Sequence, residues 1–287
     1  TTGKYNVAVG YQSMYNNTYG TSNSALGYNA MYSNTSGINN IAFGYDALMD
    51  NTVGYNNTAM GANALGNNVT GGYNAAFGLN ALVNNSGGSN NTALGADALY
   101  TANGTQYNVA VGYAAMFYTT TGDSSTAVGY QALYTNTTGY GNTALKFNTF
   151  GYANVAVGNN ALLANTTGVN NIAIGYQALT NNITGNNNVA MGILALGYNT
   201  VGGNNVALGS QALYANVSGS YNVAIGRDAL FYADGTVSNV AVGTRAMYST
   251  TTGDLNTAVG FNALYSNTTG AGNTALGTQS LYYNTVG

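Results

Sequence analysis

Apolar and polar residues follow one fixed pattern along the whole chain. The pattern is N-x-A-Φ-G, where Φ is apolar, and it recurs at a constant period of seventeen, as from Asn6 to Asn23. A constant period is the sequence signature of a repeat architecture. We number each copy from position 1, the first residue of this pattern. The copies begin at Asn6, Asn23, Asn40, Asn57, Asn74, Asn91, Asn108, Ser125, Asn142, Asn154, Asn171, Asn188, Asn205, Asn222, Asn239, Asn256 and Asn273.

The positions differ in how strictly they are kept. Position 3 is alanine in every copy, and positions 4 and 9 are always apolar. Position 5 is glycine except at Lys146, and position 8 is alanine in most copies. An always-small position is expected to face a close neighbour. The always-apolar positions 4 and 9 are expected to face a core, where each buried side chain contributes about 1.5–3 kcal/mol.

Positions 1–5 predict a short strand, because apolar residues at positions 2 and 4 flank the alanine with a period of two. Glycine at position 5 then permits a sharp corner. Positions 6–10, typically Y-Q-A-L-Y, fit either a second short strand or arc, which we favour, or a single helical turn. The N-T-T-G segment at positions 12–15 predicts a turn in which glycine or asparagine can take positive φ.

One copy cannot bury enough surface to fold alone, so like copies are expected to stack. The prediction is an all-β, parallel β-solenoid (β-roll) of seventeen stacked repeats, in which every full repeat forms one turn. At about 4.8 Å per turn the stack would be roughly 80 Å long. We predict one continuous array over residues 1–287, taken as a section of a longer fibre.

One copy, residues 142–153, is shorter than the others. It keeps positions 1–9 and 15–17 and lacks positions 10–14. It also carries Lys146, Thr149 and Phe150 at positions that are elsewhere mostly Gly, Ala and Leu. We predict a pinched turn here, with stacking continuing from the copy at Ser125 to that at Asn171, rather than a domain boundary.

Composition narrows the function. Only 4% of the residues are charged, and the chain lacks His, Cys and Glu. A hydrolytic dyad or triad is therefore excluded, and we predict no enzyme activity, no cofactor and no metal site. Four scattered cations cannot neutralise a nucleic-acid backbone, and no apolar run approaches the length of a membrane span. The seven Asp residues do not follow a calcium-binding repeat and are expected to be structural or solubilising.

The pieces NTALG, NNIAIG, NVAVG and NVALG, followed by x-x-A, resemble the head repeats of YadA-like trimeric autotransporter adhesins. They are also similar to repeat arrays of phage-type tail fibres. The resemblance covers the whole chain through about half of each copy, and the extra residues here lie in the Y-x-N-T-T region. It implies a left-handed β-roll, a homotrimer, and an extracellular location on a cell surface or virion tail fibre.

The sequence therefore predicts a non-catalytic structural fibre or adhesin stalk that attaches to surfaces. Its partners would be copies of itself, as a homotrimer or filament, and host-surface or matrix glycans. One alternative is a self-assembling extracellular filament in which the repeats are the polymer. A second is an ice-binding solenoid, suggested by rows of threonine that are interrupted by Val, Ile, Ser and Gly.

Two sets of residues are candidate interaction or modification sites. Tyrosine is frequent at positions 6 and 10 and predicts an aromatic stripe that either stacks on sugars or packs against a neighbouring chain. The asparagines and threonines at positions 12–14 are expected to form a ladder of stacked, hydrogen-bonded amides, or alternatively to carry N-linked glycans at N-x-S/T sequences or O-linked glycans. The stripe includes Tyr11, Tyr15, Tyr28, Tyr32, Tyr130 and Tyr134, and the glycosylation candidates are Asn34, Asn68, Asn136, Asn165, Asn182, Asn216 and Asn267.

Overall fold

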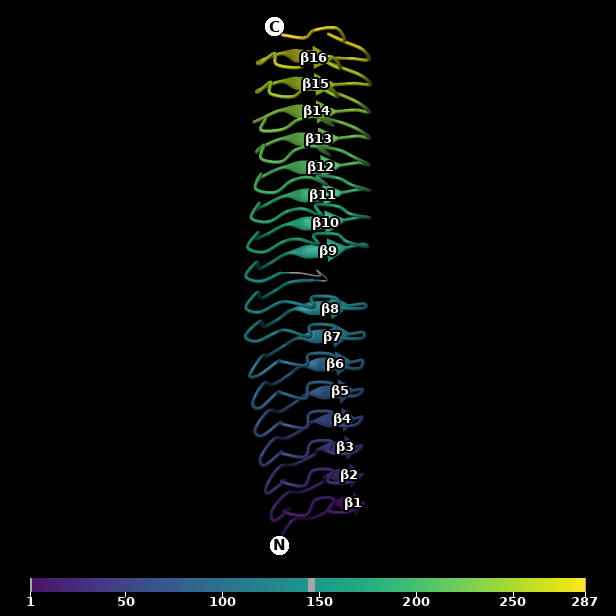
Figure 1. The fold of residues 1–287 in the computed structure, drawn as a ribbon, viewed down its shortest axis with the longest axis vertical. Helices are drawn as coiled ribbons and strands as arrows, with labels where there is room; N and C mark the ends of the chain where they lie inside the picture. The colour runs from purple at the N-terminus through teal and green to yellow at the C-terminus, as the bar shows by residue number, and fades with distance from the viewer. Residues whose placement is uncertain (1, 144–147, 287) are drawn as a thin grey trace. The chain divides into compact units, whose positions relative to one another are not determined.

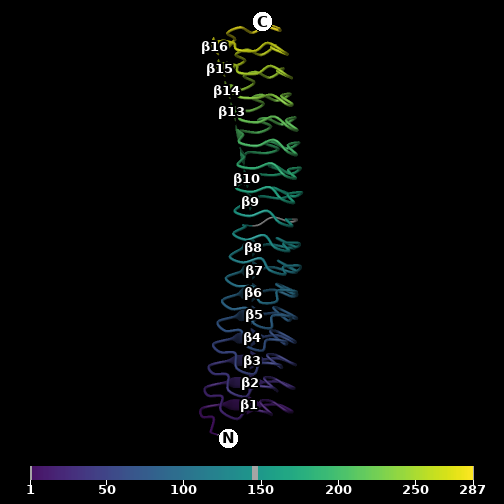
Figure 2. The same ribbon diagram turned by 90° about the vertical axis from the view of Figure 1, so that its left-hand side faces the viewer.

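The protein is a parallel β-solenoid in which each repeat makes one turn. A computed structural model describes residues 2–143 and 148–286. The chain divides into two compact units, Thr1–Ala144 and Leu145–Gly287, which we describe separately. In each unit the three-residue strands stack in chain order (Figure 1), and each turn occupies its own level (Figure 2). The prediction of an all-β solenoid with one repeat in each turn is confirmed.

Each unit contains one sheet of eight parallel strands. The first sheet consists of β1 (Val7–Val9), β2 (Ser24–Leu26), β3 (Ile41–Phe43), β4 (Thr58–Met60), β5 (Ala75–Phe77), β6 (Thr92–Leu94), β7 (Val109–Val111) and β8 (Thr126–Val128). The second consists of β9 (Val155–Val157), β10 (Ile172–Ile174), β11 (Val189–Met191), β12 (Val206–Leu208), β13 (Val223–Ile225), β14 (Val240–Val242), β15 (Thr257–Val259) and β16 (Thr274–Leu276).

Neighbouring strands pair in strict register, so the same repeat position lies above itself in successive turns. Ala8 pairs with Ala25, and Ala25 pairs with Ala42. The expected pinched turn at 142–153 includes residues 144–147, which lie outside the described residues, so the pinching stays a prediction. The predicted alignment of its second half is wrong. Oδ1 of Asn148 accepts a hydrogen bond from Nδ2 of Asn165 at 2.7 Å, so Asn148 occupies position 12 and Gly151 position 15, and the missing positions lie before position 12.

The direction in which the strand side chains point corrects one prediction. Alanine at position 3 is buried in every described strand after β1, but none of the position-4 residues in these strands is buried. Leu26 is 49% exposed, Phe43 37% and Val128 61%. The period of two is correct, but the small residue faces inward and its apolar neighbours face outward.

Positions 6–10 form neither of the predicted elements. In the described repeats they are a series of turns, without a second strand or a helix. Non-glycine residues at positions 7 and 9 take positive φ, as in Asn29 (51°) and Met31 (53°). This uncommon backbone brings position 8 alanines and position 9 leucines or methionines into the interior, where Leu48 and Leu65 are fully buried. The core role of position 9 is therefore confirmed.

Two ladders of buried asparagine occupy the rest of the interior. At position 12, the amide Nδ2 of Asn34 donates to Oδ1 of Asn17 (2.8 Å), and that of Asn51 donates to Oδ1 of Asn34 (2.8 Å). At position 1, Nδ2 of Asn23 donates to the carbonyl of Gly37 (2.7 Å), while its Oδ1 accepts the backbone N–H of Asn40 (2.9 Å). The predicted ladder of stacked asparagine amides is confirmed, at position 12 of the predicted positions 12–14. Because buried amides without partners are costly, these bonds also fix the register of the stack.

Glycine at position 15 is required by the position-12 ladder. A Cβ on Gly37 would lie 2.3 Å from Oδ1 of Asn34 and 2.5 Å from the carbonyl oxygen of Gly54. Real Cβ atoms do not approach other atoms so closely, so this position has no room for any side chain while the ladder is in place. Position 15 is part of the predicted turn, but the positive φ of that region falls two residues later, as at Asn39 (56°).

Candidate interaction surfaces

The outward residues of the strands form a continuous apolar row on each unit. We call the residues at positions 2 and 4 of β1–β8, and likewise of β9–β16, the strand face. It contains Val, Ile, Leu, Phe, Met, Thr, Ala and one Ser, and no charged residue. Exposed side chains such as Leu26, Phe43, Met60 and Leu94 lie on it. Contiguous exposed apolar surface of this kind marks association in soluble proteins.

Tyrosines at the predicted stripe positions stack on one another between turns. At position 6, the rings of Tyr11 and Tyr28 lie 5.1 Å apart with nearly parallel planes. At position 10, Tyr15 and Tyr32 lie 5.4 Å apart. The stripe is therefore two parallel ladders, each following one repeat position, and their partners lie within the chain.

The other predicted stripe residues belong to the same two ladders. Tyr130 stacks on Tyr113 at 5.6 Å, and Tyr134 stacks on Phe117 at 5.4 Å. These rings keep an edge or a face toward solvent, and Tyr11, Tyr15 and Tyr130 are the most exposed of the six predicted residues. Stacking within the chain does not distinguish the two predicted roles, sugar stacking and contact with another chain, and both stay predictions.

The second unit carries a longer position-10 ladder. Tyr214, Phe231, Tyr248, Tyr265 and Tyr282 stack at 4.9–5.3 Å between ring centroids. Burial raises the pKa of the Tyr248 phenol, and a hydrogen bond with Tyr232 adds to this. For Tyr214, a hydrogen bond with Tyr198 is the main cause of a raised pKa, followed by burial.

The predicted glycosylation sites do not lie on the surface. All seven occupy position 12 and are fully buried: Asn34, Asn68, Asn136, Asn165, Asn182, Asn216 and Asn267. Nδ2, the atom to which a sugar would be attached, donates hydrogen bonds inside the ladder, as in Asn68 to Oδ1 of Asn51 (2.9 Å) and Asn182 to Oδ1 of Asn165 (2.9 Å). A glycan at these positions would require the interior to open, so the folded structure gives this prediction no support.

Several of the seven aspartates accept hydrogen bonds between turns. Oδ1 of Asp123 accepts the backbone N–H of Gln106 at 2.7 Å. Asp254 accepts that of Val237 at 2.7 Å. Among the described residues, no three His, Cys, Asp or Glu side chains gather as a metal site would need. In the same part of the chain there is no helix with the length and apolar character of a membrane span.

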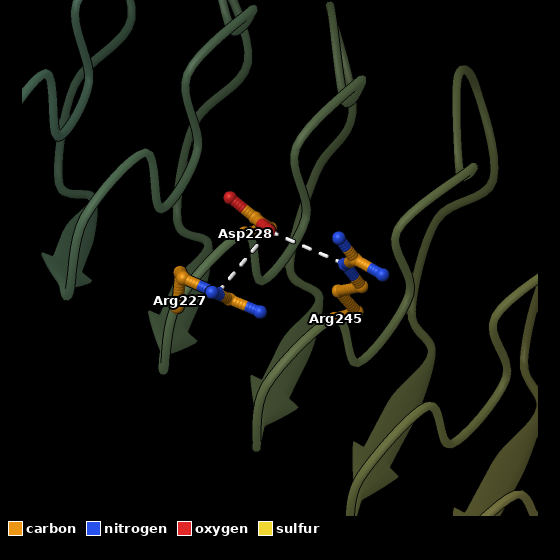
Figure 3. A network of polar contacts seen from close by, with 3 residues as sticks. All are labelled: Arg227, Asp228 and Arg245. Carbon is orange, nitrogen blue, oxygen red and sulfur yellow. Dashed lines mark hydrogen bonds and ion pairs between the residues drawn. The ribbon is translucent and has the colours of Figure 1, made fainter.

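A cluster of three charged side chains lies on the second unit. Asp228 lies between Arg227 and Arg245, which come from successive turns of the second unit (Figure 3). Oδ2 of Asp228 is 3.6 Å from Nε of Arg227 and 3.3 Å from Nε of Arg245. The sequence analysis missed this cluster, although Asp228 and Arg245 are one repeat period apart and therefore lie at the same position of successive turns.

The comparisons with known proteins assign no family. A scan of the chain against protein-family models found no match, and a search of the curated proteins found no significant match either.

Proposed function

We propose that this chain is a structural, non-catalytic fibre protein that acts outside the cell by attaching to surfaces. The observation that carries the proposal is the uniform stack itself: successive turns of each unit repeat the same buried residues and the same hydrogen bonds. Such a fold can be lengthened turn by turn without a new core, which is the property that stalks and fibres need. The resemblance to adhesin and tail-fibre repeats points in the same direction.

The strand face supports self-association as part of this function. Eight strands about 4.8 Å apart, each about 10 Å long, give roughly 380 Å² per unit. The strand face of one unit is therefore about half of the about 800 Å² per partner found in stable protein complexes, and each further unit that packs on another copy adds the same area. Copies of this chain are therefore the proposed occupants of the strand face, as a trimer or as a filament.

A protein partner accounts for the strand face better than ice does. Position 4 varies between Val9, Leu26, Phe43 and Met60 in the first four strands. A lattice of identical water molecules would favour a row of one small side chain. Side chains of unequal size can instead interdigitate with those of a second sheet packed about 10 Å away.

The test is the mass and shape of the full-length chain in solution. We expect sedimentation and electron microscopy to show a discrete trimer or an extended filament. Replacing Phe43, Leu94 and Met191 with Lys places charges on the strand face of both units and should dissociate the assembly while the secondary structure is retained. Ser36→Lys, at an exposed turn residue, is the matched control and should leave the assembly intact. A wild-type chain that stays monomeric at concentrations of about 100 μM would refute the proposal, because a fibre held together by its strand faces has to associate at such concentrations.

A further inference from the structure

The charged cluster on the second unit has the geometry of an anion-binding site. Its side chains are unequally exposed: Asp228 is 10% exposed, Arg227 60% and Arg245 43%. The buried carboxylate contacts only the Nε edge of each arginine. A guanidinium has five N–H donors. In the described part of the chain, no hydrogen bond or ion pair engages the terminal amino nitrogens of either arginine, so most of their donors face outward.

Asp228 thus accepts a hydrogen bond from Arg245 and lies beside Arg227, and one carboxylate cannot neutralise both guanidiniums. Two positive charges and one negative charge leave a local net charge of +1, in a chain whose overall charge is −3. A planar guanidinium fork matches the two oxygens of a carboxylate or sulfate.

An aromatic surface adjoins the arginines. The guanidinium carbon of Arg245 lies 5.7 Å from the ring centroid of Tyr248. Tyr248 continues in the position-10 ladder, and the half-exposed Tyr232 lies edge-on to it at 5.3 Å. Aromatic faces beside a cation provide stacking for a sugar ring next to the group that binds its charge.

The first unit contains a natural counterpart that lacks the arginines. The copies at Asn91 and Asn222 end in similar sequences, TANGT and YADGT, and each is followed by a copy that carries Met and then TTTGD. In this alignment Asp228 corresponds to Asp97. Arg227 and Arg245 correspond to Ala96 and Ala114. The fold therefore accommodates this block without either arginine, so stacking alone does not explain their presence.

We propose that Arg227 and Arg245, positioned by Asp228, bind the carboxylate or sulfate group of an acidic polysaccharide. This inference rests on the proposed role in surface attachment and names the chemistry of the surface. Tyr248 and Tyr232 would contact the sugar ring that carries the charged group.

The experiment is calorimetric or NMR titration of the full-length chain with two acidic probes, an oligogalacturonate and a sulfated oligosaccharide. A methyl-esterified oligogalacturonate serves as the neutral probe. We expect saturable binding of at least one acidic probe, weaker binding at higher salt, and no binding of the neutral probe. Binding of the galacturonate alone would identify carboxylate as the ligand, and binding of the sulfated probe alone would identify sulfate.

Two variants locate the site. Arg227→Ala with Arg245→Ala copies the first unit's own sequence, so it is expected to fold, and it should weaken binding about tenfold or more. Ala96→Arg with Ala114→Arg transfers the arginines to the first unit and should raise the stoichiometry. Unchanged affinity in the first variant, or no binding of either acidic probe by the wild type, would overturn the inference. If the wild type assembles normally but binds neither probe, this inference fails and the proposed fibre function stands.

Discussion

Replacement of Gly37 by alanine tests how the interior is built. The new Cβ would lie 2.3 Å from Oδ1 of Asn34, 2.5 Å from the carbonyl of Gly54 and 2.7 Å from Nδ2 of Asn51. These contacts involve backbone or buried amides that cannot turn away without losing a partner. The side chain of Asn34 would have to leave the ladder or the turn would have to separate from its neighbour.

The expected cost follows from these contacts. Overpacking a filled interior costs about 1–3 kcal/mol, and each hydrogen bond lost from the ladder adds about 0.5–1.5 kcal/mol. Gly37→Ala should therefore destabilise its turn by about 2–4 kcal/mol. Amide hydrogen exchange on the full-length chain measures this locally, because stability in a repeat protein is distributed over neighbouring turns. Ser36→Ala, one residue away and exposed, is the control.

The chain itself contains the compensating change. Where position 12 is Ala102, position 15 is Thr105 instead of glycine, and position 12 of the next turn is Thr119. The same trio recurs as Ala233, Thr236 and Thr250. A bulkier residue at position 15 is thus found where the asparagine oxygen is missing.

Transplanting this solution tests the reasoning. The segment 34–37 replaced by A-N-G-T, together with Asn51→Thr, should be clearly more stable than Gly37→Ala although it changes more of the chain. The loss should not vanish, because the hydroxyl oxygens of Thr105 and Thr119 are buried without a partner. If Gly37→Ala melts and exchanges like the wild type, or if the transplant is the less stable of the two, the steric coupling is wrong.

Three further predictions concern the core and the titrating groups. Leu48→Ala should lower the free energy of unfolding by about 2–5 kcal/mol, because it leaves a cavity at a fully buried position. Leu26→Ala on the strand face should cost far less in a monomeric state. Urea denaturation of both variants measures the difference. Burial and the neighbouring Asp46 raise the pKa of Asp50. Its contribution to the free energy of unfolding is therefore fully present below the ordinary pKa of an aspartate and is lost as the pH rises through the folded-state pKa. The pH dependence of stability should become flatter in Asp50→Asn. The phenols of Tyr214 and Tyr248 have raised pKa values, so their contribution to stability should persist below about pH 10 and be lost as the pH rises above it. Ultraviolet titration should show a fraction of tyrosines that ionises late, and Tyr248→Phe should reduce this fraction. A single transition at the ordinary tyrosine pKa would contradict this.

The period of the sequence was enough to predict the fold class, because register follows from it. Residues that are one repeat period apart must lie above one another once turns stack, which predicts the pairing of Tyr11 with Tyr28 and the ladder of Asn34 and Asn51. Which side chains of the strand point inward was not predictable in the same way. Alternation does not tell which of two faces points inward, and the interior accepts alanine at position 3 because the rest of it is filled by position 9 and the asparagines.

Three features were missed for different reasons. Positive φ at Met31 is adopted by a residue type that rarely takes it, unlike Asn29, whose type is enriched there; it is imposed by the closure of the turn and by bonds to the adjacent turns. The ion pair of Asp228 with Arg245 did carry a sequence signal, because the two residues are one repeat period apart and stacking places them above one another. Position 1 was predicted only as the first residue of the strand segment, although its asparagine, present in all copies but Ser125, forms a second buried and hydrogen-bonded ladder.

The position-12 ladder also gives each stack an electrical direction. Nδ2 of the later turn donates to Oδ1 of the earlier turn at Asn34, Asn51 and Asn68 alike. The amide dipoles therefore add along the axis and polarise one another. One end of such a ladder presents acceptors and the other presents donors, so a further turn, or a further chain, can extend it only head to tail. A growing assembly would therefore have two chemically different ends, one that presents amide acceptors and one that presents amide donors.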